Sequence, residues 1–142
     1  MPYLRTYRVF ISHAWHRSED YWRVVQFLDD APNFRWENLS VPEHNPIVDP
    51  EPEKKLRDQM RPADVFLIIA GMYTAHSEWI DFVLAFARRI GRPVIGIRKW
   101  GGQVIPTAIT AAARGIVGWS GAGVVRAIRQ HALPSGDYKR VT

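Results

Sequence analysis

Polar and aromatic side chains gather where two predicted strands end, and their types suit the binding of a sugar or a phosphate. The run "VFISHAW" places Ser12, His13 and Trp15 at one corner, and "WENLS" places Asn38 and Ser40 at the next. A hydroxyl and an imidazole can contact ribose or phosphate oxygens, and an indole offers a stacking face. Together they predict a ligand pocket.

Each of these residues also has a purely structural explanation. Ser12 and Ser40 can cap turns, and Asn38 can form an Asx-turn with its own backbone. Trp15 can be part of the core. The sequence leaves both explanations open for every residue taken singly.

Four histidines fall on the same predicted corners, namely His13, His16, His44 and His76. Three imidazoles could bind a metal ion, but nothing in their spacing fixes a coordination geometry, so we expect no metal site. The chain has no cysteine, which excludes disulfides, thiolate metal sites and a cysteine nucleophile.

The elements that must position these residues alternate between strands and helices. Short apolar, β-branched or aromatic runs predict strands at residues 7–12, 34–38, 64–71, 93–100 and 115–120. Capping residues and apolar residues at helical spacing predict helices at 19–28, 52–60, 77–90, 106–114 and 122–133. Ser18 and Ser77 are expected as N-caps, and Gly91 as a left-handed C-cap.

This alternation predicts an α/β fold, a flavodoxin-like three-layer sandwich with a five-stranded parallel sheet of order 2-1-3-4-5. Ligands of such folds bind at the carboxyl ends of the strands. The corners that matter are therefore 12–16, 38–46, 71–77 and 100–102. The stretch Leu39–Pro52 holds four prolines and is predicted to be a stiff, extended loop.

Several frequent functions of this fold do not fit the sequence. The strand ends lack the acidic cluster of a phosphate-accepting receiver domain, and no G-x-x-x-x-G-K-[ST] loop is present. The run "SHAWHRSED" is too bulky for the phosphate loop of a flavodoxin. The run "GWSGAG" could offer backbone N–H groups to an anion, although tight helix entry explains it equally well.

Composition places the chain among ordinary globular proteins. The 142 residues are 46% hydrophobic and 23% charged, so we expect one domain, 1–142, with a proper core. The apolar runs are too short to cross a bilayer and no signal-peptide pattern opens the chain, so we expect a cytoplasmic protein. The net charge of +5 fits a solvated basic face better than a nucleic-acid interface.

Five segments, in order along nearly the whole chain, resemble one family. They are "YRVFISHAW", "FRWENLSVPEHNP", "ADVFLIIAGMYTAHSEWI", "ARRIGRPVIGIRKWG" and "IVGWS". The family is that of bacterial TIR-like (Toll/interleukin-1 receptor-like) domains, and specifically the TIR-like subunit of Thoeris antiphage defence systems. The resemblance implies cleavage of the nicotinamide–ribose bond of NAD to make an ADP-ribose-derived messenger, which activates a separate effector protein. It adds Ser77 and Trp79 to the expected substrate-binding residues.

The sequence departs from the family at the residue that should do the chemistry. The family motif S-x-W-x-x-x-E carries a catalytic Glu six residues after its Ser, and counting from Ser77 reaches Val83. Valine can neither hydrogen-bond a ribose diol nor balance the positive charge of the ribosyl centre. Glu43 and Asp81 are the better candidates for a substitute acid, ahead of Glu78 and Glu37.

Two functions therefore stay open. The first is an NAD glycohydrolase or ADP-ribosyl cyclase with an atypical acid, and the second is an inactive module that recognises a nucleotide or another TIR domain. We expect NAD as substrate or ligand and no further cofactor. The expected partners are an NAD-like or ADP-ribose-like nucleotide and an effector reached through a diffusible messenger. Pairing with a second copy is open, and neither a membrane nor nucleic acid is expected.

Overall fold

A five-stranded, all-parallel sheet forms the centre of the protein. The computed structural model describes residues 5–12, 19–40, 52–72 and 77–134. The strands are β1 (Thr6–Ile11), β2 (Arg35–Asn38), β3 (Val65–Ile69), β4 (Val94–Ile97) and β5 (Gly115–Val117). They lie in the order β2-β1-β3-β4-β5, which confirms the predicted topology.

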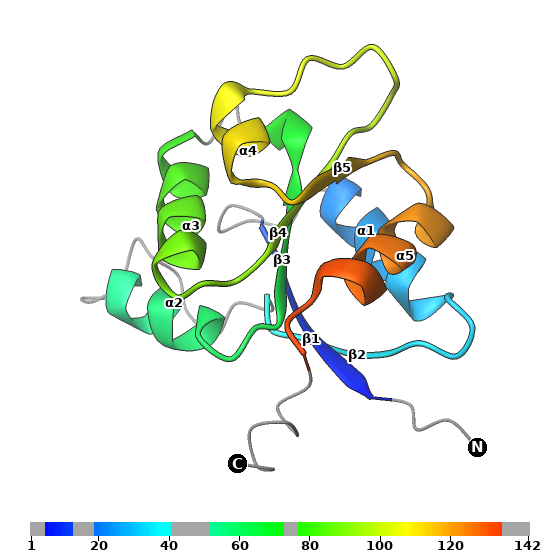
Figure 1. Cartoon of the computed structure of the whole chain (residues 1–142), viewed down its shortest axis with the longest axis horizontal. Helices are drawn as coiled ribbons and strands as arrows, with labels where there is room; N and C mark the ends of the chain where they lie inside the picture. The colour runs from blue at the N-terminus through cyan, green and yellow to red at the C-terminus, as the bar shows by residue number, and fades with distance from the viewer. Residues whose placement is uncertain (1–4, 13–18, 41–51, 73–76, 135–142) are drawn as a thin grey trace.

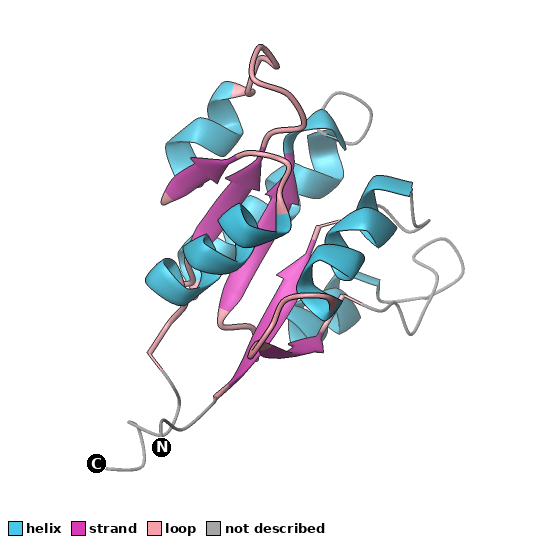
Figure 2. Ribbon diagram, turned by 90° about the vertical axis from the view of Figure 1, so that its right-hand side faces the viewer, coloured by secondary structure: helices cyan, strands magenta, loops and turns pink. Residues whose placement is uncertain are grey.

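Helices cover both faces of the sheet (Figures 1 and 2). On one face lie α1 (Glu19–Asp29) and α5 (Gly121–His131), which contact each other. On the other lie α2 (Pro52–Met60), α3 (Ser77–Arg89) and α4 (Thr107–Ala112). In the described part of the chain, no helix has the length and apolar character needed to cross a membrane.

Strand β3 shows how the sequence produces these layers. All five of its residues are buried, as expected of a central parallel strand with helices on both sides. Because side chains alternate along a strand, Val65, Leu67 and Ile69 join the core under α1 and α5. Phe66 and Ile68 join the core under α2, α3 and α4.

Three strands end earlier than predicted at their carboxyl ends. The strand expected to reach Trp100 is β4, which ends at Ile97. Strand β3 ends at Ile69, because residues Ala70–Met72 turn into a short 3-10 helix. The last strand ends at Val117 instead of Ser120. The reason is that Ser120 is the N-cap of α5, where its hydroxyl accepts a hydrogen bond from the Gly123 N–H at 2.9 Å. N-capping therefore takes this serine out of the strand.

The amino ends of the strands are held together by a buried ion pair that the sequence did not reveal. Asp64, 4% exposed, contacts Arg5 at 3.1 Å and Arg8 at 3.4 Å. It also accepts a hydrogen bond from the Arg8 backbone N–H at 2.9 Å. The Asp64 carbonyl accepts from the Leu133 N–H at 3.0 Å. The start of β1, the start of β3 and the chain after α5 thus meet at one residue, Asp64.

The end of α3 confirms the predicted left-handed cap. Gly91 has a φ of 71°. Its N–H donates to the Arg88 carbonyl at 3.1 Å, and the Arg92 N–H donates to the Ala87 carbonyl at 2.8 Å. This pair of bonds is the Schellman motif. It turns the chain from α3 directly into β4.

Replacing this glycine should strain the backbone without creating a clash. Gly91→Ala is expected to lower the free energy of unfolding by about 1 kcal/mol, because a Cβ disfavours positive φ. No atom lies within 4 Å of a Cβ built at either Gly91 or Gly101, but only Gly91 has a positive φ. Gly101→Ala is therefore the matched control. Urea denaturation of both variants tests this, and equal effects would contradict it.

Candidate functional site

The structure brings two of the predicted corners side by side at the carboxyl edge of the sheet. Ser12 directly follows β1, and Asn38 ends the neighbouring strand β2. The Ser12 N–H donates to the Leu67 carbonyl at 2.8 Å, which fixes the end of β1 against β3. Helix α3, which Ser77 begins, starts at the same edge (Figure 1).

Ser12 is a buried polar residue without a visible structural task. Its side chain is fully buried, and its hydroxyl has no hydrogen-bond partner among the described residues. Leaving a hydroxyl buried and unpaired costs about 1–3 kcal/mol of stability. The predicted alternative, in which Ser12 caps a turn, would give that hydroxyl a partner. A ligand oxygen at this corner would do the same.

Unlike Ser12, the residues Asn38 and Ser40 are hydrogen-bonded to each other. The Ser40 N–H donates to the Asn38 Oδ1 at 2.9 Å, and the Ser40 hydroxyl donates to the same oxygen. The Asn38 amide donates to the Tyr21 hydroxyl at 2.9 Å. The Asx-turn that was the structural alternative for Asn38 is thus confirmed. The network ends β2 and ties it to α1.

Sequence reasoning missed the part that Tyr21 plays in this network. Tyr21 belongs to the apolar stripe of α1 and is fully buried, as the helical spacing predicts. Nothing in that spacing shows that its hydroxyl lies against Asn38 at the end of another element. Only the fold supplies this proximity.

On α3, the residues at the positions of the S-x-W-x-x-x-E motif differ in how deeply they are buried. Ser77 is half-buried at the first position of the helix. Trp79 is half-buried and packs against the core cluster under α2, α3 and α4. Val83 is fully buried in that same cluster. The position where the resemblance predicts an acid is therefore a core position in this chain.

The candidate substitute acids on described residues are exposed. Glu78 and Asp81 lie on the exposed side of α3, and Glu37 is exposed on β2. The only buried acid among the described residues is Asp64, which lies at the amino edge of the sheet with Arg5 and Arg8. No carboxylate among the described residues is buried at the carboxyl edge, so burial identifies no catalytic acid there.

Three predicted residues, His13, Trp15 and Glu43, lie outside the described residues, as do the histidines considered for a metal, His13, His16, His44 and His76. Within the described ranges, no group of three side chains could hold a metal ion.

A further residue of this edge, which the sequence did not single out, is Lys99. The Lys99 ammonium pairs with the Asp20 carboxylate at 2.9 Å and lies 5.7 Å from the centre of the Trp119 ring. The Lys99 N–H donates to the Gln103 side chain at 2.7 Å. These contacts tie the loop after β4 to the start of α1 and to the loop after β5. From the sequence alone, Lys99 was interpreted only as one of the cations of a solvated basic face.

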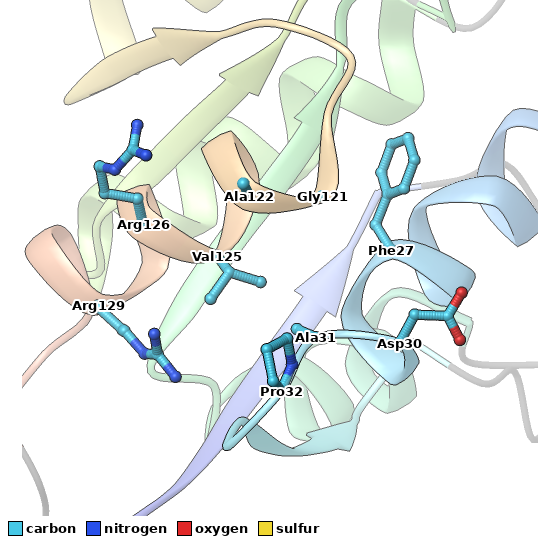
Figure 3. A pocket seen from close by; sticks show the side chains of 9 residues that line it. All are labelled: Phe27, Asp30, Ala31, Pro32, Gly121, Ala122, Val125, Arg126 and Arg129. Atoms are coloured by element: carbon cyan, nitrogen blue, oxygen red, sulfur yellow. The ribbon is translucent and has the colours of Figure 1, made fainter.

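Two cavities can be described, and no predicted site residue lines either of them. The larger, about 490 Å³, is a groove between α1 and α5. Figure 3 shows Phe27, Asp30 and Pro32 on one side of it and Val125 and Arg126 on the other. The smaller, about 200 Å³, lies where α3 and α4 end.

A comparison with protein families assigns the chain. The model of one family, described as "Thoeris protein ThsB, TIR-like domain", matches residues 10–103. The matched stretch runs from Phe10, near the end of β1, to Gln103, and so contains Ser12, Asn38, Val83 and Lys99. No curated protein matches the sequence. With two thirds of its length matched and the sheet order expected of the fold, the chain belongs to the family of TIR-like domains of the Thoeris protein ThsB.

Proposed function

We propose that this protein is a TIR-like component of Thoeris antiphage defence. It binds a nucleotide of the NAD or ADP-ribose type at the carboxyl edge of its sheet. It cleaves NAD slowly or not at all. The observation that carries the proposal is the complete burial of Val83 in the apolar core.

Cleavage of the nicotinamide–ribose bond builds up positive charge on the ribose. A carboxylate beside the ribose balances this charge and orients the hydroxyls. Val83 presents only hydrocarbon, and it packs in a cluster that includes Phe66 and Ile68. The residue at this position stabilises the docking of α3 on the sheet and contributes nothing polar to the edge.

The neighbouring acids of α3 do not replace it. At 100° a residue, Asp81 lies about 200° around the helix from Val83, and its side chain is exposed. Glu78, in the first turn, is also exposed and is explained by the favourable interaction of an acid with the helix dipole.

Ligand binding does not need that acid. The buried Ser12 hydroxyl has no partner among the described residues, and a ribose hydroxyl or a phosphate oxygen would supply one. Hydrogen bonds and ring stacking bind a ribose-bearing ligand through groups other than the missing carboxylate. The family match is the support for choosing a nucleotide as this ligand.

A second candidate function is NAD cleavage with Glu43 as the acid, giving an ADP-ribose-derived messenger for a separate effector protein. The resemblance to TIR-like enzymes is what favours it, and Glu43 lies within the matched residues 10–103.

Removing the Ser12 hydroxyl should separate binding from stability. Ser12→Ala is expected to leave the free energy of unfolding unchanged or slightly higher, because it removes an unpaired buried group. It should weaken the binding of ADP-ribose, measured by calorimetry, by about tenfold, the loss of one hydrogen bond to the ligand. Ser40→Ala is the control: its hydroxyl is bonded to Asn38, so it should cost about 1 kcal/mol of stability. Unaltered ADP-ribose affinity in Ser12→Ala would contradict the site.

Incubation with NAD should release no nicotinamide above a protein-free control, since no carboxylate stands at position 83. Chromatographic detection of nicotinamide measures this. Rapid release that Glu43→Gln abolishes and Asp81→Asn leaves intact would establish the second candidate function instead.

Restoring the family's acid should damage the core. Val83→Glu buries a carboxylate among apolar side chains, and we expect it to lower the free energy of unfolding by about 3–5 kcal/mol. Ala85→Glu is the matched control, because Ala85 is exposed on the same helix and should change stability by about 0.5 kcal/mol or less. If Val83→Glu were as stable as Ala85→Glu and released nicotinamide, position 83 would face the site, and the packing argument would fail.

A further inference from the structure

The loop that follows β4, residues 98–103, lies at the carboxyl edge on the other side of β3 from Ser12. It approaches the end of β3 closely, because a Cβ built at Gly71 would stand 3.1 Å from the Gln103 Nε2. On its other side, the end of β3 accepts the Ser12 N–H through the Leu67 carbonyl. The ends of β1 and β4 therefore flank the end of β3 (Figure 1).

Hydrogen bonds fix the shape of this loop. The Gln103 N–H donates to the Trp100 carbonyl at 3.0 Å, and the Lys99 N–H donates to the Gln103 side chain at 2.7 Å. The Arg98 N–H donates to the Val117 carbonyl at 2.8 Å, which ties the start of the loop to β5. The loop is thus ordered before any ligand arrives, and this lowers the entropy cost of binding.

The two cations of the loop differ in how their charge is balanced. The Lys99 ammonium is paired with the Asp20 carboxylate at 2.9 Å. The Arg98 side chain is half-buried and makes no ion pair within the described part of the chain. Its Nη1 donates to the Gly101 carbonyl at 3.1 Å, and its Nε is buried without a described partner. The bond to Gly101 uses one of the five N–H donors of the guanidinium and leaves its charge unbalanced.

Arg98 and Ser12 lie on the same face of the sheet. Each extends the hydrogen-bond ladder of its strand by one residue, so the alternation of side chains along a strand still applies to both. Val94, four residues before Arg98, and Phe10, two residues before Ser12, both belong to the core under α2, α3 and α4. Both polar side chains therefore lie on the face that α3 covers, at the edge where α3 begins.

The register of the strands gives the separation of these two residues. The pairing of β1, β3 and β4 puts Ser12 level with Gly96 on β4, and Arg98 lies two residues further along. Two strand spacings across the sheet and two residues along it separate their Cα atoms by about 12 Å. A ribose joined to a diphosphate fits such a gap, with a sugar hydroxyl at Ser12 and phosphoryl oxygens at Arg98.

We infer that Arg98 binds the diphosphate of the nucleotide whose ribose is hydrogen-bonded to Ser12. This role of Arg98 rests on the proposed function and specifies which part of the ligand each residue contacts. A guanidinium matches phosphoryl oxygens in charge and geometry and binds them through paired hydrogen bonds. A diphosphate would accept from the donors that Gly101 leaves free and would balance the charge that no described carboxylate balances.

Calorimetric titration of the full chain with ADP-ribose tests this role. Arg98→Gln should weaken binding by about tenfold or more, because charge-assisted hydrogen bonds to the ligand are lost. Rising salt concentration should weaken the binding of ADP-ribose to the unchanged protein, and Arg98→Gln should reduce this salt dependence. A purely structural role, through the bond to Gly101, would leave the salt dependence unchanged.

Two further variants serve as controls. Arg114→Gln should bind ADP-ribose like the unchanged protein, since Arg114 is an exposed arginine at the amino edge of the sheet. Arg98→Lys keeps the charge but loses the paired donors, so its affinity should lie between those of Arg98→Gln and the unchanged protein.

The opposite results separate this role from the proposed function. Absence of ADP-ribose binding by the unchanged protein would overturn both. Binding that Ser12→Ala weakens and Arg98→Gln does not would leave the nucleotide site in place and exclude Arg98 from it. An equal loss of affinity in Arg114→Gln, or an unaltered salt dependence in Arg98→Gln, would also exclude a contact between Arg98 and the diphosphate.

Discussion

Helix α3 contacts the sheet through a hydrocarbon face, and Val83 is a fully buried member of that face. The same helix begins at the carboxyl edge, where ligands of this fold bind. A residue six positions into it can therefore serve the core or the site. Valine serves the core: it joins Phe66, Ile68 and their neighbours and offers no charge. What remains for chemistry at the edge comes from the strand ends and loops.

The two edges of the sheet differ in how their polar groups are satisfied. At the carboxyl edge, Asn38, Ser40 and Tyr21 bond one another, while the Ser12 hydroxyl has no partner among the described residues. At the amino edge, arginines outnumber the one buried carboxylate, Asp64. Since stable folds rarely leave buried polar groups without a partner, the carboxyl edge is where a small polar ligand would be accommodated.

Most of the fold could be predicted because it follows from local patterns. The apolar run of β3 predicts a strand, the apolar stripe of α3 predicts a helix, and the glycine after α3 predicts its cap. The alternation of strands and helices along the chain then predicts the topology. The predicted ends of strands were wrong where a residue fits two kinds of local structure. Ser120, for example, could extend a strand or cap the following helix. The Asp64 ion pair and the Tyr21–Asn38 contact join residues distant in sequence, so no local pattern could reveal them. The site was predictable only as a place where strands end.

Ligand binding and NAD cleavage require different interactions at the carboxyl edge of the sheet. A ribose-bearing ligand is held by hydrogen bonds and stacking, which act equally on the ground state and the transition state and so confer affinity without rate. Cleavage requires a group whose interaction strengthens as positive charge develops on the ribose. A valine where an acid is expected lacks only the second kind of interaction, and Val83 contributes buried hydrocarbon to the core. A TIR-like domain altered at this one position can thus keep its fold and its ligand while losing its reaction.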